Sequence, residues 1–110
     1  MKEFILVNNN HQKTVFRLGQ NANENHQLVD DSDPNDWWFH LSDYASGHCI
    51  VEKLELTNED IIYASTLIKE NSKYKYIKKL SFCYTQVKNI KKTKNPGEVI
   101  ILNKPYYFIL

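Results

Sequence analysis

The chain has 110 residues and a mass of 13.0 kDa; 42% of its residues are hydrophobic, 25% are charged and 13% are aromatic. This length and composition are typical of one globular domain spanning residues 1–110, and they exclude multidomain, disordered and fibrous proteins. The formal net charge of +1 conceals a division, because residues 1–60 carry four basic against eleven acidic residues, whereas residues 61–110 carry ten lysines against two acids.

No segment of the chain resembles a membrane span or an export signal, since no apolar run approaches the ~20 residues that cross a bilayer. Cys49 and Cys83 are single thiols without a CxxC spacing, which is typical of a reducing compartment. We therefore expect a cytoplasmic protein, with the nucleus as the alternative. Twelve Asn, 13 Lys and 10 Ile against one Arg indicate an A+T-rich genome.

The first half of the chain predicts strands and one long loop. Residues 2–7 and 14–18 are rich in β-forming residues on either side of a polar break, and they predict an opening hairpin. Residues 19–36 are polar without a periodic apolar pattern, so we expect a loop there, with at most a short helical turn. Residues 37–41 and 48–54 predict two paired strands joined by a turn.

The second half predicts one main helix, over about residues 58–72. Thr57 followed by Asp60 resembles a capping box, and apolar residues then recur at helical spacing. Residues 80–87 predict a strand and residues 88–97 a loop with four lysines, while residues 99–102 and 106–109 predict a closing hairpin that turns at 103–104. The sequence therefore predicts an α+β fold, with a largely antiparallel sheet, one main helix packed on it and a hairpin at each end.

Nine lysines lie between Lys69 and Lys94, a concentration typical of a phosphate-binding surface. The alternative is an ordinary solvated surface, because lysine is also the usual exposed residue of a lysine-rich protein.

Motifs for catalysis and cofactors are weak. The four histidines lack the spacing of zinc ligands, and the aspartates between residues 30 and 43 are typical of turns. The sequence contains no phosphate-binding G-x-x-x-x-G-K-[ST] loop, no G-x-G-x-x-G and no G-x-S-x-G. We therefore expect no metal, no cofactor and, on balance, no catalysis.

Aromatic residues offer a further clue. Trp37 and Trp38 must point to opposite faces of a strand, so one is expected in the core. The other, with tyrosines among residues 74, 76, 84, 106 and 107, is a candidate platform for stacked bases, although core packing is the alternative for each ring.

Six short stretches form a combination that is more specific than any one of them. Residues 19–29 (GQNANENHQLV), 36–40 (DWWFH) and 47–48 (GH) have the order and spacing of G-R-N-x-x-x-N-D-x-L-T, D-x-W-F-H and P-G-S-H. Residues 64–72, 83–87 and 91–97 follow a small-residue helix, a V-x-Y-T strand and a K-K-x-x-x-x-P-G loop. Together these stretches resemble the NFACT-R (NFACT RNA-binding) domain family from about residue 15 to residue 109. The resemblance implies a module that binds tRNA or ribosomal RNA, in translation or ribosome-associated quality control.

The chain departs from the family at two points. Gln20 stands where the family has Arg, so a neutral amide replaces a charge-assisted phosphate contact, and Ala45-Ser46-Gly47 replaces P-G-S before His48. The chain is most similar to the shorter, stand-alone group typified by coiled-coil domain-containing protein 25. We expect neither that group's coiled coil nor the N-terminal domains with which longer members elongate stalled peptides.

The resemblance and the charge division give an RNA-binding module as the first hypothesis. Its expected RNA-binding residues are Gly19, Gln20, Asn21, Asn25, Asp36, Trp38, Phe39, His40, Gly47, His48, Lys88, Lys91, Lys92 and Lys94. Two alternatives stay open. One is an RNA-processing or RNA-modifying enzyme that uses His40 and His48 as acid and base. The other is a module for an acidic, ribosome-associated protein partner, whose surface would be five lysines that suit RNA equally well: Lys69, Lys73, Lys75, Lys78 and Lys79. DNA in place of RNA also stays open.

Overall fold

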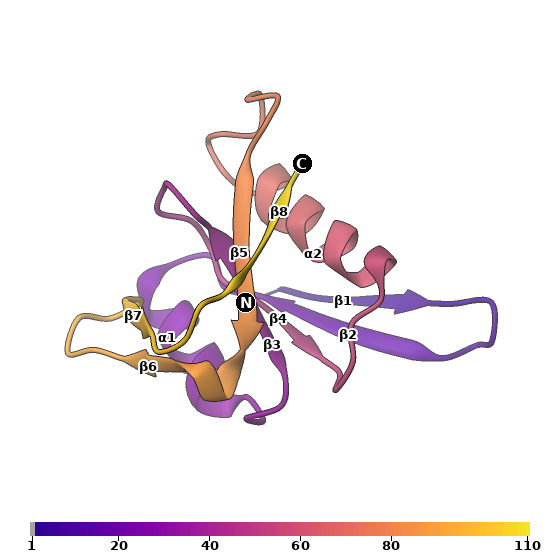
Figure 1. Cartoon of the computed structure of the whole chain (residues 1–110), viewed down its shortest axis with the longest axis horizontal. Helices are drawn as coiled ribbons and strands as arrows, with labels where there is room; N and C mark the ends of the chain where they lie inside the picture. The colour runs from indigo at the N-terminus through magenta and orange to yellow at the C-terminus, as the bar shows by residue number, and fades with distance from the viewer. Residues whose placement is uncertain (1) are drawn as a thin grey trace.

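A six-stranded antiparallel sheet organises residues 2–110, the part of the chain that the computed structural model describes (Figure 1). The strand order is β1-β2-β4-β3-β5-β8. The strands are β1 (Lys2–Val7), β2 (Lys13–Leu18), β3 (Trp37–Leu41), β4 (Cys49–Glu52), β5 (Ser81–Gln86) and β8 (Tyr106–Ile109). With two helices added, this is the predicted α+β fold with an antiparallel sheet, and the prediction is confirmed.

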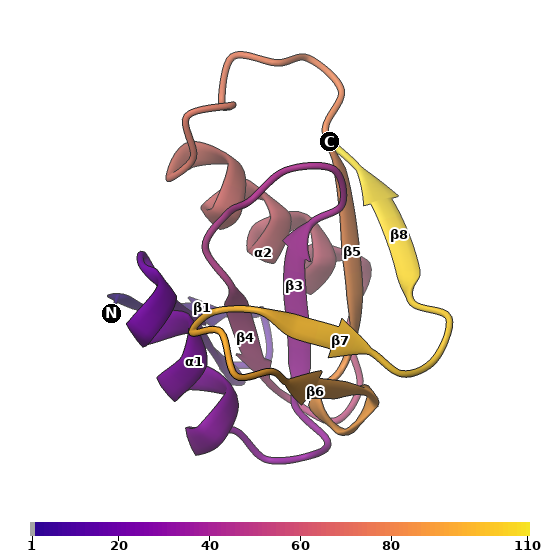
Figure 2. The ribbon, with the colours of Figure 1, turned by 90° about the vertical axis from the view of Figure 1, so that its left-hand side faces the viewer.

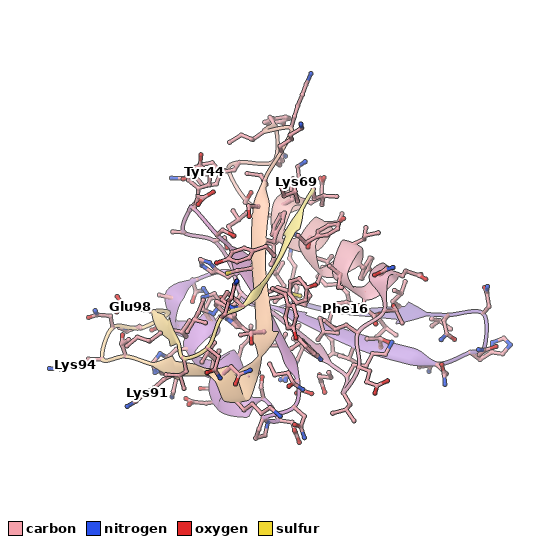
Figure 3. The ribbon with its side chains drawn as sticks, viewed as in Figure 1. Phe16, Tyr44, Lys69, Lys91, Lys94 and Glu98 are labelled. Carbon is pink, nitrogen blue, oxygen red and sulfur yellow. The ribbon has the colours of Figure 1, made fainter. Side chains whose placement is uncertain are left out.

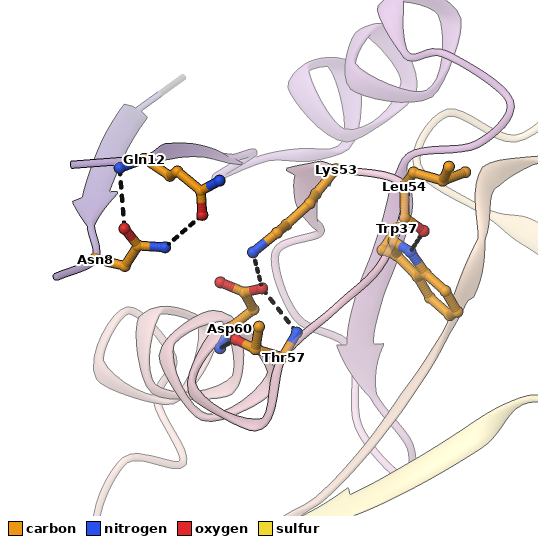
Figure 4. A network of polar contacts seen from close by, with 7 residues as sticks. All are labelled: Asn8, Gln12, Trp37, Lys53, Leu54, Thr57 and Asp60. Atoms are coloured by element: carbon orange, nitrogen blue, oxygen red, sulfur yellow. Dashed lines mark hydrogen bonds and ion pairs between the residues drawn. The ribbon is translucent and has the colours of Figure 1, made fainter. Parts of the chain in front are cut away.

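The opening hairpin is formed as predicted. β1 and β2 pair in register, with Phe4 opposite Phe16, and extend as an arm on the right of Figure 1. The side chain of Asn8 organises the turn, because its Oδ1 accepts hydrogen bonds from the backbone N–H groups of Asn10 and Gln12, both at 2.9 Å. The amide of Asn8 also donates to the side chain of Gln12 (Figure 4).

Alternation along β3 gives the sheet two apolar faces. Phe39 and Leu41 point into one core, which also holds Phe16 and Phe82. Trp38 points to the opposite face and packs in a second cluster with Leu28, Ile50, Cys83, Val87 and Ile90. Different elements cover the two faces: α2 (Asn58–Glu70) lies behind the sheet in Figure 2, and α1 and the β6–β7 hairpin, described below, lie on the other side.

The main helix begins and ends close to the predicted residues. Thr57 is its N-cap, and the reciprocal bonds of a capping box join Thr57 to Asp60. Lys53 of the preceding loop forms an ion pair with Asp60 at 2.7 Å, which ties β4 to the first turn of α2 (Figure 4). No helix within residues 2–110 is long and apolar enough to span a membrane.

The loop predicted over residues 19–36 is wrong, because Ala22–Asp31 form a second helix, α1. Six of its ten residues are weak helix formers, namely Asn, His, Val and Asp residues. The side chain of Asn21 accepts from the N–H of Glu24, however, and the Glu24 carboxylate accepts from the N–H of Gln20. Leu28 packs fully buried beside Trp38. The N-cap and the burial of Leu28 therefore stabilise a helix that apolar periodicity does not predict.

The closing hairpin is also wrong in its pairing. Ile90–Lys92, predicted as loop, form β6, which follows a short 3₁₀ turn (Val87–Asn89) and pairs with β7 (Val99–Ile101). β8 pairs instead with β5. In this arrangement Val99 and Ile101 pack against the Trp38 cluster, while β8 covers the open edge of β5. Burial and edge pairing thus outweigh the local turn signal at residues 103–104.

Candidate nucleic-acid interface

An open pocket of about 600 Å³ lies where the start of α1 meets the end of α2. We call it the outer pocket. Four segments distant in sequence line it: Gln20, Asn21, Ala22 and Asn25; His40 with Ala45, Ser46 and Gly47; Asn71, Ser72 and Lys73; and Asn95, Pro96, Gly97 and Glu98. The structure therefore brings together five of the residues that the sequence selected, namely Gln20, Asn21, Asn25, His40 and Gly47.

Two glycines allow the loops behind this pocket to approach closely. A Cβ on Gly19 would lie 2.2 Å from Oδ1 of Asn25, and a Cβ on Gly47 would lie 2.3 Å from the carbonyl oxygen of Gly19. The backbone N–H of His48 donates to the same Oδ1 at 3.0 Å, and the N–H of Gly19 donates to the carbonyl of His48 at 2.9 Å. These four residues fix the shape of the wall that carries His48.

Trp38, His40 and His48 form an aromatic cluster on the α1 face of the sheet. The rings of Trp38 and His40 are stacked with centroids 5.6 Å apart, and the ring of His48 stands edge-on to both. The indole N–H of Trp38 donates to Nδ1 of His48 at 3.1 Å. Because an indole nitrogen can only donate, neutral His48 carries its proton on Nε2.

His40 has the opposite tautomer. Its Nδ1 lies in hydrogen-bond contact with the carbonyl oxygen of Leu41. A carbonyl oxygen can only accept, so the proton of His40 is on Nδ1 and its Nε2 is an acceptor. The two rings, with centroids 5.0 Å apart, thus present one donor and one acceptor nitrogen.

Burial keeps both histidines uncharged at neutral pH. It lowers the pKa of His48 to about 3, with the neighbouring His40 as a smaller cause. Burial also lowers the pKa of His40, opposed in part by the bond to Leu41. A general acid must hold a proton at the working pH. This geometry therefore gives no support to His48 as an acid that acts near neutral pH.

A second pocket, of about 310 Å³, adjoins the first, and we call it the inner pocket. It shares His40, Ala45, Gly97 and Glu98 with the outer pocket. Its remaining lining is mostly apolar or aromatic: Trp38, Leu41, Ser42, His48, Cys83, Val99 and Ile101. No lysine or arginine lines the inner pocket, whereas Lys73 lines the outer one.

The four lysines selected between residues 88 and 94 lie outside both pockets. Lys92 forms an ion pair with Asp30 of α1, and Lys88 contacts the side chain of Asn35. Lys91 and Lys94 are exposed and project from the β6–β7 hairpin (Figure 3).

Asp36 and Phe39 also line neither pocket. Asp36 precedes β3, at the end opposite His40, where its carboxylate accepts from the N–H of Asp33 at 3.0 Å and burial raises its pKa. Phe39 is fully buried in the core beneath α2. We now expect both residues to support the site indirectly.

The candidate RNA-binding residues chosen from the sequence did not include residues 71–73 and 95–98, which line the outer pocket. The available signal was the alternation of lysine and tyrosine in residues 73–79 (KYKYIKK), which we call the basic loop. Tyr74 anchors this loop by stacking on Tyr44, with ring centroids 4.2 Å apart. Tyr76 is 86% exposed, and Nζ of Lys75 lies 5.2 Å from its ring centroid. Lys73 of this loop lines the outer pocket, and the exposed ring of Tyr76 follows three residues later between lysines.

The prediction that the two tryptophans face opposite sides is confirmed. Trp38 is buried, whereas Trp37 is half-buried and contacts the rings of Tyr84 and Tyr106, each with centroids 6.1 Å away. The indole N–H of Trp37 donates to the carbonyl of Leu54 (Figure 4). This aromatic group lies on the α2 face, across the sheet from both pockets.

Neither cysteine nor any acidic cluster builds a metal centre in the described residues. No three His, Cys, Asp or Glu side chains of residues 2–110 gather closely enough to hold an ion. Cys49 and Cys83 are free and buried, and burial raises the pKa of both thiols.

Residues 3–102 match the sequence profile of the NFACT protein RNA-binding domain. The chain belongs to this family. All the residues that line the two pockets fall within the match, and the NFACT-R membership supports an RNA-binding module in general. No curated protein sequence matches the chain significantly.

Among solved structures, the NFACT-R chain is similar to the C-terminal part of the fibronectin/fibrinogen-binding protein from Streptococcus suis, with a TM-score of 0.85 and 19% sequence identity. The similarity covers 100% of this chain and 45% of that chain. At this identity the likeness establishes the fold.

Proposed function

We propose that this domain binds tRNA or ribosomal RNA across the outer pocket and the basic loop, in translation or ribosome-associated quality control, without catalysis of its own. The observation that carries the proposal is the convergence of the family's motif residues on one pocket, beside lysines and an exposed tyrosine. Membership of the stand-alone group of the family and a cytoplasmic location are part of the same proposal.

The chemistry of this surface suits RNA. Gln20, Asn21 and Asn71 offer neutral amide groups, which can contact ribose and base edges. Lys73 and Lys75 supply charge for phosphates, and Tyr76 supplies a ring for stacking. The side chain of Gln20 at the family's arginine position lowers the positive charge of the pocket, so the basic loop carries more of the phosphate binding.

The test is a titration of fluorescent tRNA, single-stranded RNA and duplex DNA into the protein at two salt concentrations. We expect log affinity for RNA to fall with log salt by about 0.7 for each phosphate contact on a single strand. If duplex DNA binds more tightly than RNA, DNA is the ligand. An RNA affinity that does not change with salt concentration would contradict the proposal.

Two double variants with the same change of charge locate the interface. Lys73→Glu/Lys75→Glu is expected to weaken RNA binding at least tenfold, because it reverses the charge beside the outer pocket. Lys91→Glu/Lys94→Glu, on the β6–β7 hairpin, is the matched control and should have the smaller effect. Unchanged binding by the first variant would contradict this placement, and a search for an acidic protein partner of the basic loop would follow.

A further inference from the structure

The inner pocket has features that ordinary core packing does not explain. It is bounded by His48, which is 2% exposed, and by His40 at the mouth that leads to the outer pocket. Nδ1 of His48 accepts a hydrogen bond from the indole of Trp38, and Nδ1 of His40 donates one to the carbonyl of Leu41. Within residues 2–110 no hydrogen bond engages Nε2 of either ring. Neither Nε2 is among the fully buried polar atoms that lack a partner, so each is reached from the pocket. An open donor and an open acceptor at the wall of the same pocket point to a ligand.

The charge around this pocket excludes an anionic ligand. Both histidines are neutral, no lysine or arginine is in the lining, and the carboxylate of Glu98 stands at the junction with the outer pocket. A phosphate group entering here would lose its hydration and meet a like charge. Phosphates are therefore expected to stay in the outer pocket, near Lys73.

The lining of the inner pocket suits a flat, neutral group. Val99 and Ile101 of β7 form an apolar wall, and the stacked rings of Trp38 and His40 are aromatic. Each of the four RNA bases carries a hydrogen-bond donor next to an acceptor on its pairing edge. An unpaired base can present this edge to His40 and His48, whereas the edge of a paired base is already occupied.

We propose that the inner pocket receives one unpaired nucleobase of the bound RNA, with Nε2 of His40 accepting a hydrogen bond from the base and Nε2–H of His48 donating one to it. This inference rests on the proposed function, because the sugar–phosphate backbone of the same nucleotide lies in the outer pocket. It makes the domain a reader of single-stranded or looped RNA.

The first experiment compares 12-nucleotide RNAs of A, C or U with an abasic 12-mer of the same backbone and charge. We expect the abasic strand to bind roughly 10- to 100-fold more weakly than the favoured base, in line with the free energy of a stacked base. Equal affinity for all four strands, with RNA binding intact, overturns the inference and leaves the proposed function standing. An absence of binding to every strand overturns both.

A pair of neighbouring substitutions assigns the effect to the inner pocket. Ile101→Trp fills it, while Ile100→Trp places the same ring on the exposed side of β7, where Ile100 is 53% exposed. The first variant is expected to lose most of its preference for base-containing over abasic strands, with the remainder coming from stacking on Tyr76, and to keep its salt dependence. The second variant is expected to discriminate as the wild type does. A preference that is unchanged in Ile101→Trp overturns the inference.

A measurement on the wild-type protein covers the case in which Ile101→Trp does not fold. The imidazole ¹H–¹⁵N correlations report the protonation and contacts of each ring nitrogen. Addition of the favoured 12-mer is expected to shift the Nε2 signals of His40 and His48, and the abasic 12-mer is expected to leave them unchanged. Identical spectra with both strands overturn the inference.

Discussion

The two faces of the central sheet differ in how completely they are covered. On the α2 face, a 13-residue helix lies across the strands and closes a core around Phe16, Phe39 and Phe82. On the other face, the cover around Trp38 consists of α1 and the β6–β7 hairpin (Figure 2). Both pockets open on this side, and the end of α2 completes the outer one. Because successive side chains of one strand alternate between these faces, β3 supplies the stable core and the candidate site at once.

The family motifs therefore have two physical roles, one on each face of the sheet. Motif residues on the α2 face, such as Phe39, hold the sheet to its helix. Those on the pocket face, such as Asn25 and His48, use their polar groups to hold loops at fixed distances. Substitutions on the two faces should therefore separate the stability of the fold from the binding of RNA.

The largest expected effect is on the α2 face. Phe39→Ala should lower the free energy of unfolding by about 3–5 kcal/mol, because it removes a fully buried ring and leaves a cavity. Urea unfolding measures the loss, and RNA affinity is measured at low temperature on the fraction that remains folded. If that fraction binds RNA much more weakly than the wild type, the two faces are not independent.

Acid should destabilise the pocket face through His48. The pKa of His48 is about 3 in the folded protein and ~6.5 in an unfolded chain. Between these values the unfolded chain binds a proton that the folded one does not. The free energy of unfolding should therefore fall as the pH drops from ~6.5 toward 3, by at most about 1.4 kcal/mol per pH unit.

Urea unfolding of the wild type and of His48→Gln between pH 7.5 and 4.5 isolates this contribution. The variant cannot titrate at this position, so its stability should depend less steeply on pH. Equal pH dependence of the two proteins would contradict the burial of a neutral His48.

The loop that carries His48 should depend on Asn25. Asn25→Ala leaves the buried backbone N–H of His48 without its acceptor, which should cost about 1–3 kcal/mol. The loosened wall should also weaken RNA binding. Asn23→Ala, on the exposed side of α1, is the matched control; an equal loss in both variants would mean that helix propensity, not the bond to His48, is measured.

The smallest expected effect concerns the ion pair between Asp30 and Lys92. Its side chains are 43% and 29% exposed, so Asp30→Asn should cost only about 0.2–1 kcal/mol and less at high salt. The substitution also releases the charge of Lys92, and RNA affinity should rise slightly at low salt. A fall in RNA affinity would show that Asp30 itself contributes to the interface.

Part of the fold was predictable because its signals are local. The capping box at Thr57 and Asp60 located the start of α2, and alternation in residues 37–41 assigned Trp37 and Trp38 to opposite faces. Part of the site was predictable as well, since residues of three separate motifs, including Asn21, His40 and Gly47, do share one pocket. The RNA contacts of these residues stay predictions.

Other features depend on contacts between distant segments. α1 lacks an apolar stripe and is held by its cap and by the burial of Leu28. The strand pairing of residues 99–109 depends on the open edge of β5 and on the surface around Trp38. Lys92 was selected as a phosphate contact, and its pairing with Asp30 follows from the position of α1, 62 residues away in sequence.

The fold class, the family motifs and the division of charge could be recognised from the amino-acid sequence, because each depends on local spacing or on composition. The position of Lys73 at the outer pocket, the open Nε2 atoms of the two histidines and the incomplete cover of the inner pocket depend on the tertiary structure. These properties are set by the packing of segments far apart in the chain, where burial and hydrogen-bond geometry outweigh local preference.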